Sequence, residues 1–450
     1  MEAIVVLDIG TTGTKAALIN RSGKILAGEY AGYDLYAQGR EVEQDPADWW
    51  QATQSSLRAL VKVVPPEARL AAIILSGQMQ DVILVGPEDA LAPAILYSDA
   101  RAQEEAAAIL VKLGEEKIIS TTGNLQDATS LLTKLLWLKR KRPELYEAAC
   151  KLMIGAHDYV TWKLCGAHMA DYTTASTTGL LDLHNNCWAE HLLKALDLRR
   201  DWLPELVLSG VQAGCVDTAA AAATGLPEGL PVFHGPGDAA TTTLGAGAGE
   251  PGRDYVYLGT SGWLAATTNG PPVDPRTGIF NLCHPNPTQL ILIGPMITAA
   301  GNFEWLRRQF GDLETARPED AYTRLNELAA QSPAGSNGLL YLPYLSGERA
   351  PFRDADARGV FFGLSITSTR QDMYRAVLEG VALSMRMIGD VMFPQGKTAE
   401  LSLVGGGVRS LLWPQIFANV FRCRVLVLAD PGDVGVRGAL LAVGKALGWY

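Results

Sequence analysis

Two short loops rich in glycine and threonine contain the residues best suited to chemistry in this 450-residue chain. Gly10-Thr11-Thr12-Gly13-Thr14-Lys15 follows Asp8 at the end of an apolar run, and Gly259-Thr260-Ser261-Gly262 follows a similar run, 255–257. Glycine lets the backbone approach an anion closely, N–H groups and threonine hydroxyls donate to phosphate oxygens, and a carboxylate can hold Mg²⁺. Either loop alone could be an ordinary β-hairpin turn. Their repetition favours a pair of phosphate-binding loops on one nucleotide.

A carboxylate flanked by glycines is the strongest candidate for a catalytic group. Gly235-Pro236-Gly237-Asp238 follows a predicted strand, 231–233, so the turn would present Asp238 with little side-chain bulk around it. Phosphoryl transfer to an alcohol needs such a group, because the attacking hydroxyl must be oriented and must lose its proton. Asp238 could instead cap the following helix, and the two roles are compatible.

Two further glycine positions could admit a nucleotide. Gly405-Gly406-Gly407 ends a predicted strand, 401–404, and precedes a predicted helix, 411–421, whose N-terminus favours negative charge. Gly301 could leave room for a flat base. The alternatives are a tight turn at the first position and helix packing at the second.

Polar residues after predicted strands of the first half could bind a sugar, because α/β proteins bind ligands at the carboxyl ends of strands. These residues are Gln78, Gln80, Asp99 and Arg101. Any one of them alone is more often a solvated loop residue. Trp49 and Trp50 follow a plausible helix start, 43–46, and we interpret them as core residues before sugar-stacking residues.

The elements that would position these residues alternate between strands and helices. Strands are predicted at 71–75, 81–85 and 425–428, and a helix at 131–141 continues toward residue 150. Ser368-Thr369-Arg370-Gln371 has capping-box spacing at the start of another helix. Because strand, Gly-Thr loop and strand occur in both halves, we predict an α/β fold of two similar halves facing each other across a cleft. The predicted domains are 1–245, with the sugar site and first phosphate loop, and 246–450, with most of the ATP site.

Composition excludes several other classes of protein. The chain is 48% hydrophobic with a net charge of −10, which argues against general binding of nucleic acid or anionic membranes. No apolar run approaches the length of a membrane span, and the charged residues of the first predicted strand argue against a secretory signal. The six cysteines form no C-x-x-C pair, so we expect reduced thiols, mostly in the core, and a soluble cytoplasmic protein.

With these motifs in place, the chain resembles the FGGY carbohydrate kinases, and within them the xylulokinase branch, over nearly its whole length. The resemblance is carried by an ordered set of segments, of which 342–351 is the most specific. They are Asp8-Ile9-Gly10-Thr11-Thr12, Glu43-Gln44-Asp45-Pro46, Ser76-Gly77-Gln78-Met79, 95–101, 134–138, 235–238, 259–262, 342–351, Arg375-Ala376-Val377-Leu378-Glu379-Gly380 and Gly405-Gly406-Gly407.

The resemblance implies two actin-like (ribonuclease H-like) ATPase domains that close on ATP and a sugar. It implies that Asp238 is the catalytic base, which also contacts the sugar, and that Asp8 lies near Mg²⁺. Met79 and Gln80 match sugar-pocket residues and join Gln78, Asp99 and Arg101 in the predicted substrate site. The predicted ATP site comprises Gly10, Thr11, Thr12, Lys15, Gly259, Thr260, Gly301, Gly406 and Gly407.

The sequence departs from the xylulokinase pattern at or near the expected sugar pocket. Gln80 stands where similar enzymes usually have His, Ala239 where they often have Asn, and Tyr97-Ser98 where they have Trp-Asn. Outside the pocket, Leu131 replaces a small residue or proline, and the chain ends at Tyr450, earlier than most relatives. These departures bear on the identity of the substrate and leave the phosphoryl chemistry untouched.

We therefore predict an ATP- and Mg²⁺-dependent kinase that phosphorylates a primary hydroxyl of a small ketose, D-xylulose first, with gluconate, ribulose and glycerol as alternatives. The expected partner is a small-molecule sugar, without nucleic acid or membrane, and a homodimer is possible because similar enzymes are often dimers. The alternative from another class is a non-enzymatic actin-like ATPase, a chaperone or filament former. Such a protein would not need the polar residues proposed for the sugar.

Overall fold

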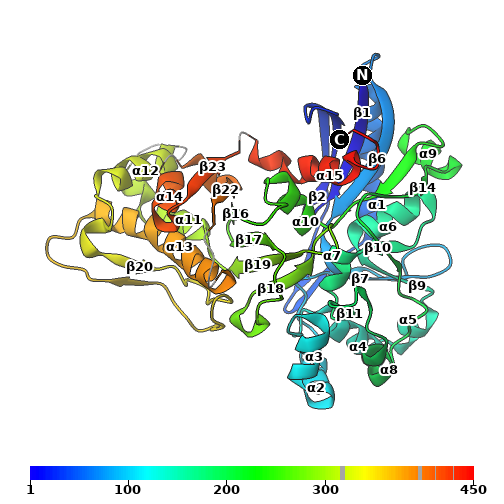
Figure 1. Ribbon diagram of the computed structural model, residues 1–450, viewed down its shortest axis with the longest axis horizontal. Coiled ribbons are helices and arrows are strands. Elements are labelled where there is room, and N and C mark those ends of the chain that lie inside the picture. The colour runs from blue at the N-terminus through cyan, green and yellow to red at the C-terminus, as the bar shows by residue number, and fades with distance from the viewer. Residues whose placement is uncertain (315–319, 394–397, 411, 429, 450) are drawn as a thin grey trace. The chain divides into compact units, whose positions relative to one another are not determined.

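The computed structural model describes residues 1–450 except 315–319, 394–397, 411, 429 and 450. The chain forms two compact units (Figure 1). The first comprises Met1–Gly245, Leu282–Leu290 and Asp433–Tyr450, and the second comprises Ala246–Asn281 and Ile291–Gly432. The predicted division into 1–245 and 246–450 stays a prediction; the units differ from it because residues 282–290 and 433–450 group with the first unit.

The first unit is built on a sheet with the strand order β14-β15-β6-β1-β2-β3. β1 pairs antiparallel with β2 and parallel with β6, which pairs parallel with β15. The carboxyl ends of the three parallel strands therefore lie along one edge of the sheet, where ligands bind in α/β proteins. The strands are β1 (Glu2–Ile9), β2 (Gly13–Asn20), β3 (Ile25–Gly32), β6 (Arg69–Gly77), β14 (Val211–Cys215) and β15 (Pro231–His234).

Alternating apolar residues of β1 divide between two cores on the two faces of this sheet. Val5 and Leu7 join a cluster with the helices on one face, and Ile4 and Val6 join a cluster with Val436 on the other. This period of two is the expected pattern for a strand buried on both faces. The helices of the first face are α1 (Pro46–Lys62), α6 (Ala156–Cys165) and α9 (Thr218–Thr224), and the second face packs on α15 (Val434–Gly444).

A second sheet of the first unit, in the order β4-β5-β8-β7-β9, contains two of the predicted sugar-binding residues, Met79 and Gln80, on β7. Its strands are β4 (Tyr36–Gln38), β5 (Glu41–Gln44), β7 (Met79–Val85), β8 (Ala94–Ile95) and β9 (Lys151–Gly155). The remaining strands are β10 (Met169–Asp171), β11 (Leu181–Asp182), β12 (Cys187–Trp188) and β13 (Glu205–Val207). The remaining helices are α2 (Gln103–Leu113), α3 (Glu115–Thr122), α4 (Leu131–Lys141), α5 (Pro143–Ala148), α7 (Tyr172–Ser176), α8 (Glu190–Leu196) and α10 (Asp238–Gly245).

The main sheet of the second unit, in the order β18-β19-β17-β16-β22-β23, repeats the central pattern of the first. β16 forms an antiparallel hairpin with β17 and pairs parallel with β22, which pairs parallel with β23. The predicted repetition of strand, Gly-Thr loop and strand is thus confirmed. The strands are β16 (Arg253–Leu258), β17 (Gly262–Thr268), β18 (Phe280–Cys283), β19 (Leu290–Met296), β22 (Glu400–Val404) and β23 (Arg424–Val427).

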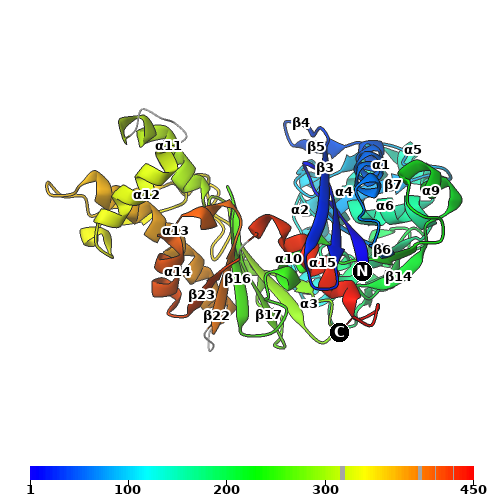
Figure 2. The same cartoon turned by 90° about the horizontal axis from the view of Figure 1, so that it is seen from above.

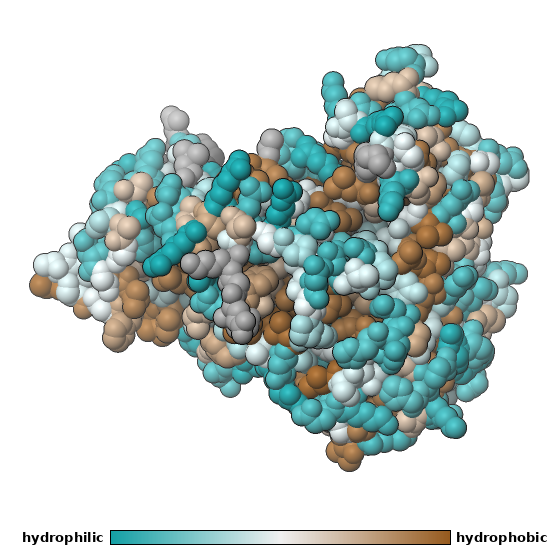
Figure 3. All heavy atoms as spheres, viewed as in Figure 1, coloured by the Kyte–Doolittle hydropathy of each residue, from teal (hydrophilic) through white to brown (hydrophobic). Residues whose placement is uncertain are grey.

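Helices α11 (Gly301–Glu314), α12 (Ala321–Gln331), α13 (Arg370–Met392) and α14 (Trp413–Phe421) complete the second unit with a small hairpin, β20 (Leu340–Leu342) and β21 (Val360–Phe362). One core cluster joins α13 and α14 to the sheet. The hairpin exposes Leu340 and Leu342 opposite Phe362 and Val360, and hydrophobic surface shows at the β20 end of this unit in Figure 3.

The predicted strands at 71–75, 81–85, 401–404 and 425–428 are confirmed to within two residues. The helix at 131–141 does not continue toward residue 150, because α4 ends at Lys141 and Pro143 begins a separate helix, α5. The capping box lies one residue later than predicted: Thr369 and Asp372 cap α13 reciprocally. Trp49 is buried in the core, and Trp50 packs against the same cluster, as interpreted.

The expectation that the cysteines lie mostly in the core is wrong. Cys283 is buried, whereas Cys150, Cys187 and Cys215 are exposed and the others are intermediate. Cysteine type alone therefore did not identify core positions here. A search of the described residues finds no helix long and apolar enough to span a membrane.

Candidate active site

The turn Gly235-Pro236-Gly237-Asp238 joins β15 to α10 at the edge where the parallel strands end. A Cβ at Gly235 would lie 2.1 Å from the Leu75 carbonyl oxygen of β6, and one at Gly237 would lie 2.1 Å from Met79 Sδ. Gly235 therefore requires glycine, because the clashing atom belongs to the β6 backbone, whereas a side chain at Gly237 would require the Met79 side chain to move. Asp238 is the first residue of α10, and the capping carbonyl is that of Gly237, which accepts from Ala240 N and Thr241 N.

The carboxylate of Asp238 is electrostatically unusual. Desolvation in its recess, reinforced by the nearby charge of Asp8, raises the pKa of Asp238 to about 7, whereas the backbone N–H of Ala239 and the charge of His157 lower it. The side chain nevertheless remains exposed, which moderates the desolvation. A carboxyl group with a raised pKa that still reaches solvent is suited to accept a proton from a hydroxyl near neutral pH.

The first Gly-Thr loop lies at the end of β1, with Asp8 opposite Lys15 in the β1–β2 register. Lys15 forms an ion pair with Asp433, which precedes α15 and lies far away in sequence. A Cβ at Gly435 would lie 3.3 Å from Asp8 Oδ2, so Asp8 faces the first turn of α15. Burial raises the pKa of Asp8, and Lys15 opposes that rise.

Gln78 links the loop to β5. Thr11 Oγ1 donates to Gln78 Oε1 at 3.0 Å, and Gln78 Nε2 donates to Gln44 Oε1 at 3.0 Å. Gln44 Nε2 in turn donates to the Thr11 carbonyl at 2.7 Å. The side chain of Gln78 is buried, so the structure places it beside the first Gly-Thr loop and behind the surface of that loop. Gly10 and Thr12 complete the same loop, in which Thr12 is exposed.

Asp99 and Arg101 form a tight pair at the loop 96–101. Arg101 contacts Asp99 Oδ2 at 2.7 Å and Glu43 Oε1 at 2.6 Å, and Asp99 Oδ2 also accepts from Val42 N at 2.6 Å. These contacts fix the loop against β5. Gln80 adopts a positive φ of 67° and donates to the Thr129 carbonyl at 3.4 Å.

In the second unit, the predicted nucleotide residues meet at one end of β16. Gly301 N donates to the Thr260 carbonyl at 3.1 Å, and a Cβ at Gly301 would lie 2.8 Å from that oxygen. Gly301 thus serves helix packing against the second Gly-Thr loop. A Cβ at Gly407 would lie 2.8 Å from Leu258 Cβ, whereas one at Gly406 would have no neighbour within 4 Å. Gly259, Thr260, Gly301, Gly406 and Gly407 therefore form one surface within this unit.

Sequence reasoning missed several buried titratable residues near the Asp238 turn. His234 Nε2 lies 2.8 Å from Asp158 Oδ1, and His157 Nε2 lies 3.3 Å from the same oxygen. Burial opposes charge on His157, but Asp158 and Asp171 raise its pKa to about 9. Three such groups could in principle hold a metal ion. The 2.8 Å contact is instead a hydrogen bond, and within the described part of the chain the Nδ1 atoms of both rings lack the outer partner usual for metal-bound histidine.

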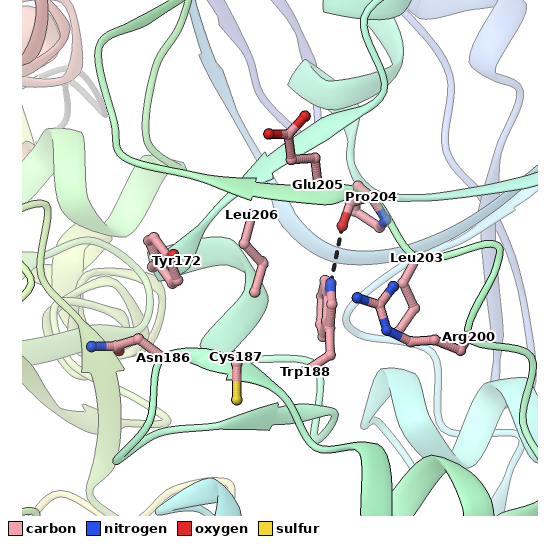
Figure 4. A pocket seen from close by; sticks show the side chains of 9 residues that line it. All are labelled: Tyr172, Asn186, Cys187, Trp188, Arg200, Leu203, Pro204, Glu205 and Leu206. Atoms are coloured by element: carbon pink, nitrogen blue, oxygen red, sulfur yellow. Dashed lines mark hydrogen bonds between the residues drawn. The ribbon is translucent and has the colours of Figure 1, made fainter.

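Another cavity of the first unit, about 490 Å³ in volume, is lined by none of the predicted site residues. Figure 4 shows Trp188 donating across it to the Pro204 carbonyl at 3.0 Å. Its lining comes from α7 and from β12, β13 and their flanking segments.

Two sheets of matching order, each with a Gly-Thr hairpin loop, and one carboxylate presented at a glycine turn define a two-domain phosphotransferase. The model of the FGGY family of carbohydrate kinases, N-terminal domain, matches residues 3–245, and that of the C-terminal domain matches residues 255–447. The chain belongs to the FGGY family of carbohydrate kinases.

Known relatives agree on the family and differ in substrate. A xylulose kinase from Escherichia coli (strain K12) is 32% identical over 95% of this chain and 87% of its own. A gluconokinase from Bacillus subtilis (strain 168) is 31% identical over 94% of this chain and 83% of its own. A ligand-bound xylulose kinase from Lactobacillus acidophilus superposes with a TM-score of 0.92 at 29% identity, covering 100% of this chain and 90% of that one.

The predicted fold class, α/β with two actin-like (ribonuclease H-like) domains, is therefore confirmed, as is the resemblance to FGGY kinases. The protein is an ATP-dependent carbohydrate kinase with a small-molecule sugar as its substrate.

Proposed function

We propose that this kinase transfers the γ-phosphoryl group of ATP to a primary hydroxyl of D-xylulose, giving D-xylulose 5-phosphate, with Asp238 as the catalytic base. The observation that carries the catalytic assignment is the exposed carboxylate of Asp238, held at a glycine turn with its pKa raised toward neutrality. The choice of D-xylulose is supported by the similarity to xylulose kinases. Gluconate is the second candidate, because a gluconokinase is almost equally similar.

The sugar would bind beside the Asp238 turn. Met79 lies against Gly237, and Gln80 follows it at a strained backbone position, so we assign both residues to the sugar pocket. Asp99 and Arg101 hold the adjoining loop through their mutual ion pair. We assign Gln78 to the same pocket from the side of the phosphate loop, through its bond to Thr11.

In the first unit, the proposed nucleotide contacts are Lys15 and Gly10–Thr12. In the second unit, they are Gly259, Thr260, Gly301, Gly406 and Gly407. Mg²⁺ fits the first of these sites, because Asp8 offers hard oxygen ligands and raises the pKa of Asp238 by its own charge. A bound cation would offset the repulsion between Asp8 and Asp238, which Lys15, paired with Asp433, offsets only in part. When bound, Mg²⁺ would neutralise charge on the phosphates.

A coupled ADP assay over D-xylulose, ribulose, gluconate and glycerol tests the proposal. We expect ADP release to depend on added sugar and kcat/KM to be highest for D-xylulose. A higher value for gluconate would reject D-xylulose and retain the kinase. Sugar-independent hydrolysis with polymerisation would favour an actin-like ATPase of the other class. Formation of a homodimer stays a prediction, which light scattering can test.

Gly406→Ala tests the nucleotide surface without disturbing the fold. An alanine Cβ at this position would meet nothing within 4 Å, and the backbone needs no positive φ there. We expect the KM for ATP to rise about tenfold, equivalent to about 1.4 kcal/mol, because the methyl group fills space reserved for the nucleotide. The KM for the sugar and the melting temperature should not change. An unaltered KM for ATP would remove Gly406 from the site.

A further inference from the structure

Asp81, on β7, is a buried carboxylate directly after the predicted sugar residues Met79 and Gln80. Its side chain is wholly inaccessible to solvent, and its Oδ1 accepts a hydrogen bond from the backbone N–H of Tyr97 at 3.2 Å. Its Oδ2 has no hydrogen-bond partner among the described residues. Burying a carboxylate with only one hydrogen bond is unfavourable, so the position of Asp81 beside the Tyr97 N–H needs an explanation.

Lys134, on α4, reaches the same peptide group from the other side. Its side chain is also fully buried, and its Nζ donates to the carbonyl oxygen of Leu96 at 2.6 Å. The Leu96 carbonyl and the Tyr97 N–H belong to one peptide unit. A carboxylate therefore contacts the N–H end of that unit, and an ammonium group contacts its carbonyl end.

Opposite charges at the two ends of a peptide unit fix its orientation. The peptide dipole points from the carbonyl oxygen toward the N–H, and this arrangement places each charge against the complementary end. A peptide flip would turn the carbonyl toward Asp81 and the N–H toward Lys134, and both contacts would become repulsive. In a buried site such electrostatic differences are large. The two charges thus determine ψ of Leu96 and φ of Tyr97.

The fixed peptide is the first peptide of the loop 96–101. The Leu96 carbonyl also accepts from Asp99 N at 3.0 Å, so residues 96–99 form a turn whose central residues, Tyr97 and Ser98, are exposed. Beyond the turn, Asp99 binds Arg101 and Val42 N. The backbone of the loop is thereby anchored at both ends, and its two exposed side chains are presented in a single orientation.

We propose that Asp81 and Lys134 are positioning residues for sugar binding: they clamp the Leu96–Tyr97 peptide and so set how the loop 96–101 meets the substrate. This inference rests on the proposed sugar site, and it assigns to Asp81 and Lys134 no contact with the substrate. Burial lowers the pKa of Lys134 to about 8 and raises that of Asp81, so each charge is costly to keep in place. We therefore interpret the two buried charges as serving substrate binding at a cost to the stability of the fold.

The double variant Asp81→Val/Lys134→Met tests the clamp, because it removes both charges together and leaves neither one unpaired. We expect it to melt at or above the temperature of the wild type, since apolar replacement of buried ions is often neutral or stabilising. The KM for the sugar should rise at least tenfold, and the KM for ATP should stay within twofold. Asp81→Asn, which keeps an acceptor for Tyr97 N–H, should retain more sugar affinity than Asp81→Val.

A matched control removes a lysine–aspartate pair at the surface of the same unit. Lys163 Nζ lies 2.9 Å from Asp89 Oδ2, and Asp89→Asn/Lys163→Met should leave both KM values unchanged. Hydrogen exchange at the Tyr97 amide gives a readout that does not need activity: we expect at least tenfold faster exchange in the clamp variant. A sugar KM within twofold of the wild type, or equal losses for sugar and ATP, would overturn the proposal. So would unchanged exchange, even if the wild type phosphorylated none of the sugars tested.

Discussion

Asp238→Asn should lower kcat by about 10³-fold, within the range that a positioned general base contributes, and leave the affinity for ATP nearly intact. The reason is that asparagine keeps the size of the side chain at the start of α10 but cannot accept a proton from the sugar hydroxyl. Steady-state kinetics with saturating sugar and ATP, with a separate nucleotide-binding measurement, provide the check. Turnover within about tenfold of the wild type, only about 1.4 kcal/mol of barrier, would contradict the assignment.

The stability of the same variant separates a catalytic role from a structural one. Because the folded-state pKa of Asp238 is raised, the folded protein binds this proton more tightly than the unfolded chain. The contribution of this carboxyl to stability therefore falls as pH rises from its ordinary pKa toward about 7. Asp238→Asn should consequently melt no lower than the wild type at pH 8, with the difference shrinking toward pH 5.

Asp217→Asn is the matched control for Asp238→Asn. Asp217 also stands at a helix start, where its side chain accepts from Ala220 N as the N-cap of α9. Asparagine caps helices about as well as aspartate, so both kcat and stability should be retained. Equal losses in the two variants would indicate that Asp238 matters only for its helix.

The sequence was most informative where the local backbone conformation or a close backbone contact favours one residue type. The glycines at 235 and 237 predicted a turn that exposes Asp238, and the structure places Gly235 against the Leu75 backbone and Gly237 against the Met79 side chain. The paired Gly-Thr hairpins follow from short-range signals of the same kind. Capping was predicted one residue too early because Ser368 and Thr369 are chemically equivalent, and only the fold selects Thr369.

Long-range contacts were not predictable. The pairing of Lys15 with Asp433 joins the first loop to a helix near the end of the chain, and no local pattern connects them. Asp81 and Lys134 were overlooked for a related reason. A charged residue in an otherwise apolar segment reveals that something unusual is buried, but its partner can be named only once the fold has brought them together.

Helix α15, which the sequence did not indicate as part of the site, supports α10, the helix that begins with Asp238, through two reciprocal close approaches. A Cβ at Gly438 would lie 1.8 Å from the Thr241 carbonyl oxygen of α10, and one at Gly245 would lie 1.9 Å from the Val434 carbonyl oxygen of α15. α10 and α15 lie side by side in the first unit (Figures 1 and 2). Any side chain at either glycine must therefore push the backbones of α10 and α15 apart.

Gly438→Ala should destabilise the protein by about 1–3 kcal/mol, the usual cost of overpacking, and lower kcat by about tenfold or more. Helix propensity alone predicts the opposite sign, because alanine favours a helix interior over glycine by about 1 kcal/mol. The steric effect should prevail since the clashing atom is a carbonyl oxygen of the backbone, which cannot rotate away. Thermal unfolding and steady-state kinetics measure the two effects.

Gly28→Ala, on β3, provides the control, because its Cβ would meet only the Ala16 carbonyl oxygen at an ordinary 3.8 Å. It should leave both melting temperature and kcat unchanged. If Gly438→Ala melted higher than the wild type, the gain in helix propensity would exceed the steric cost. That result would mean that α10 and α15 can move apart to accept the methyl group. If it melted lower with full kcat, α15 would stabilise the first unit without positioning Asp238. A lower melting temperature together with a lower kcat would indicate that α15, Asp433 just before it and the Asp238 turn form one rigid unit. Such rigidity would hold the catalytic carboxylate in place for the sugar hydroxyl.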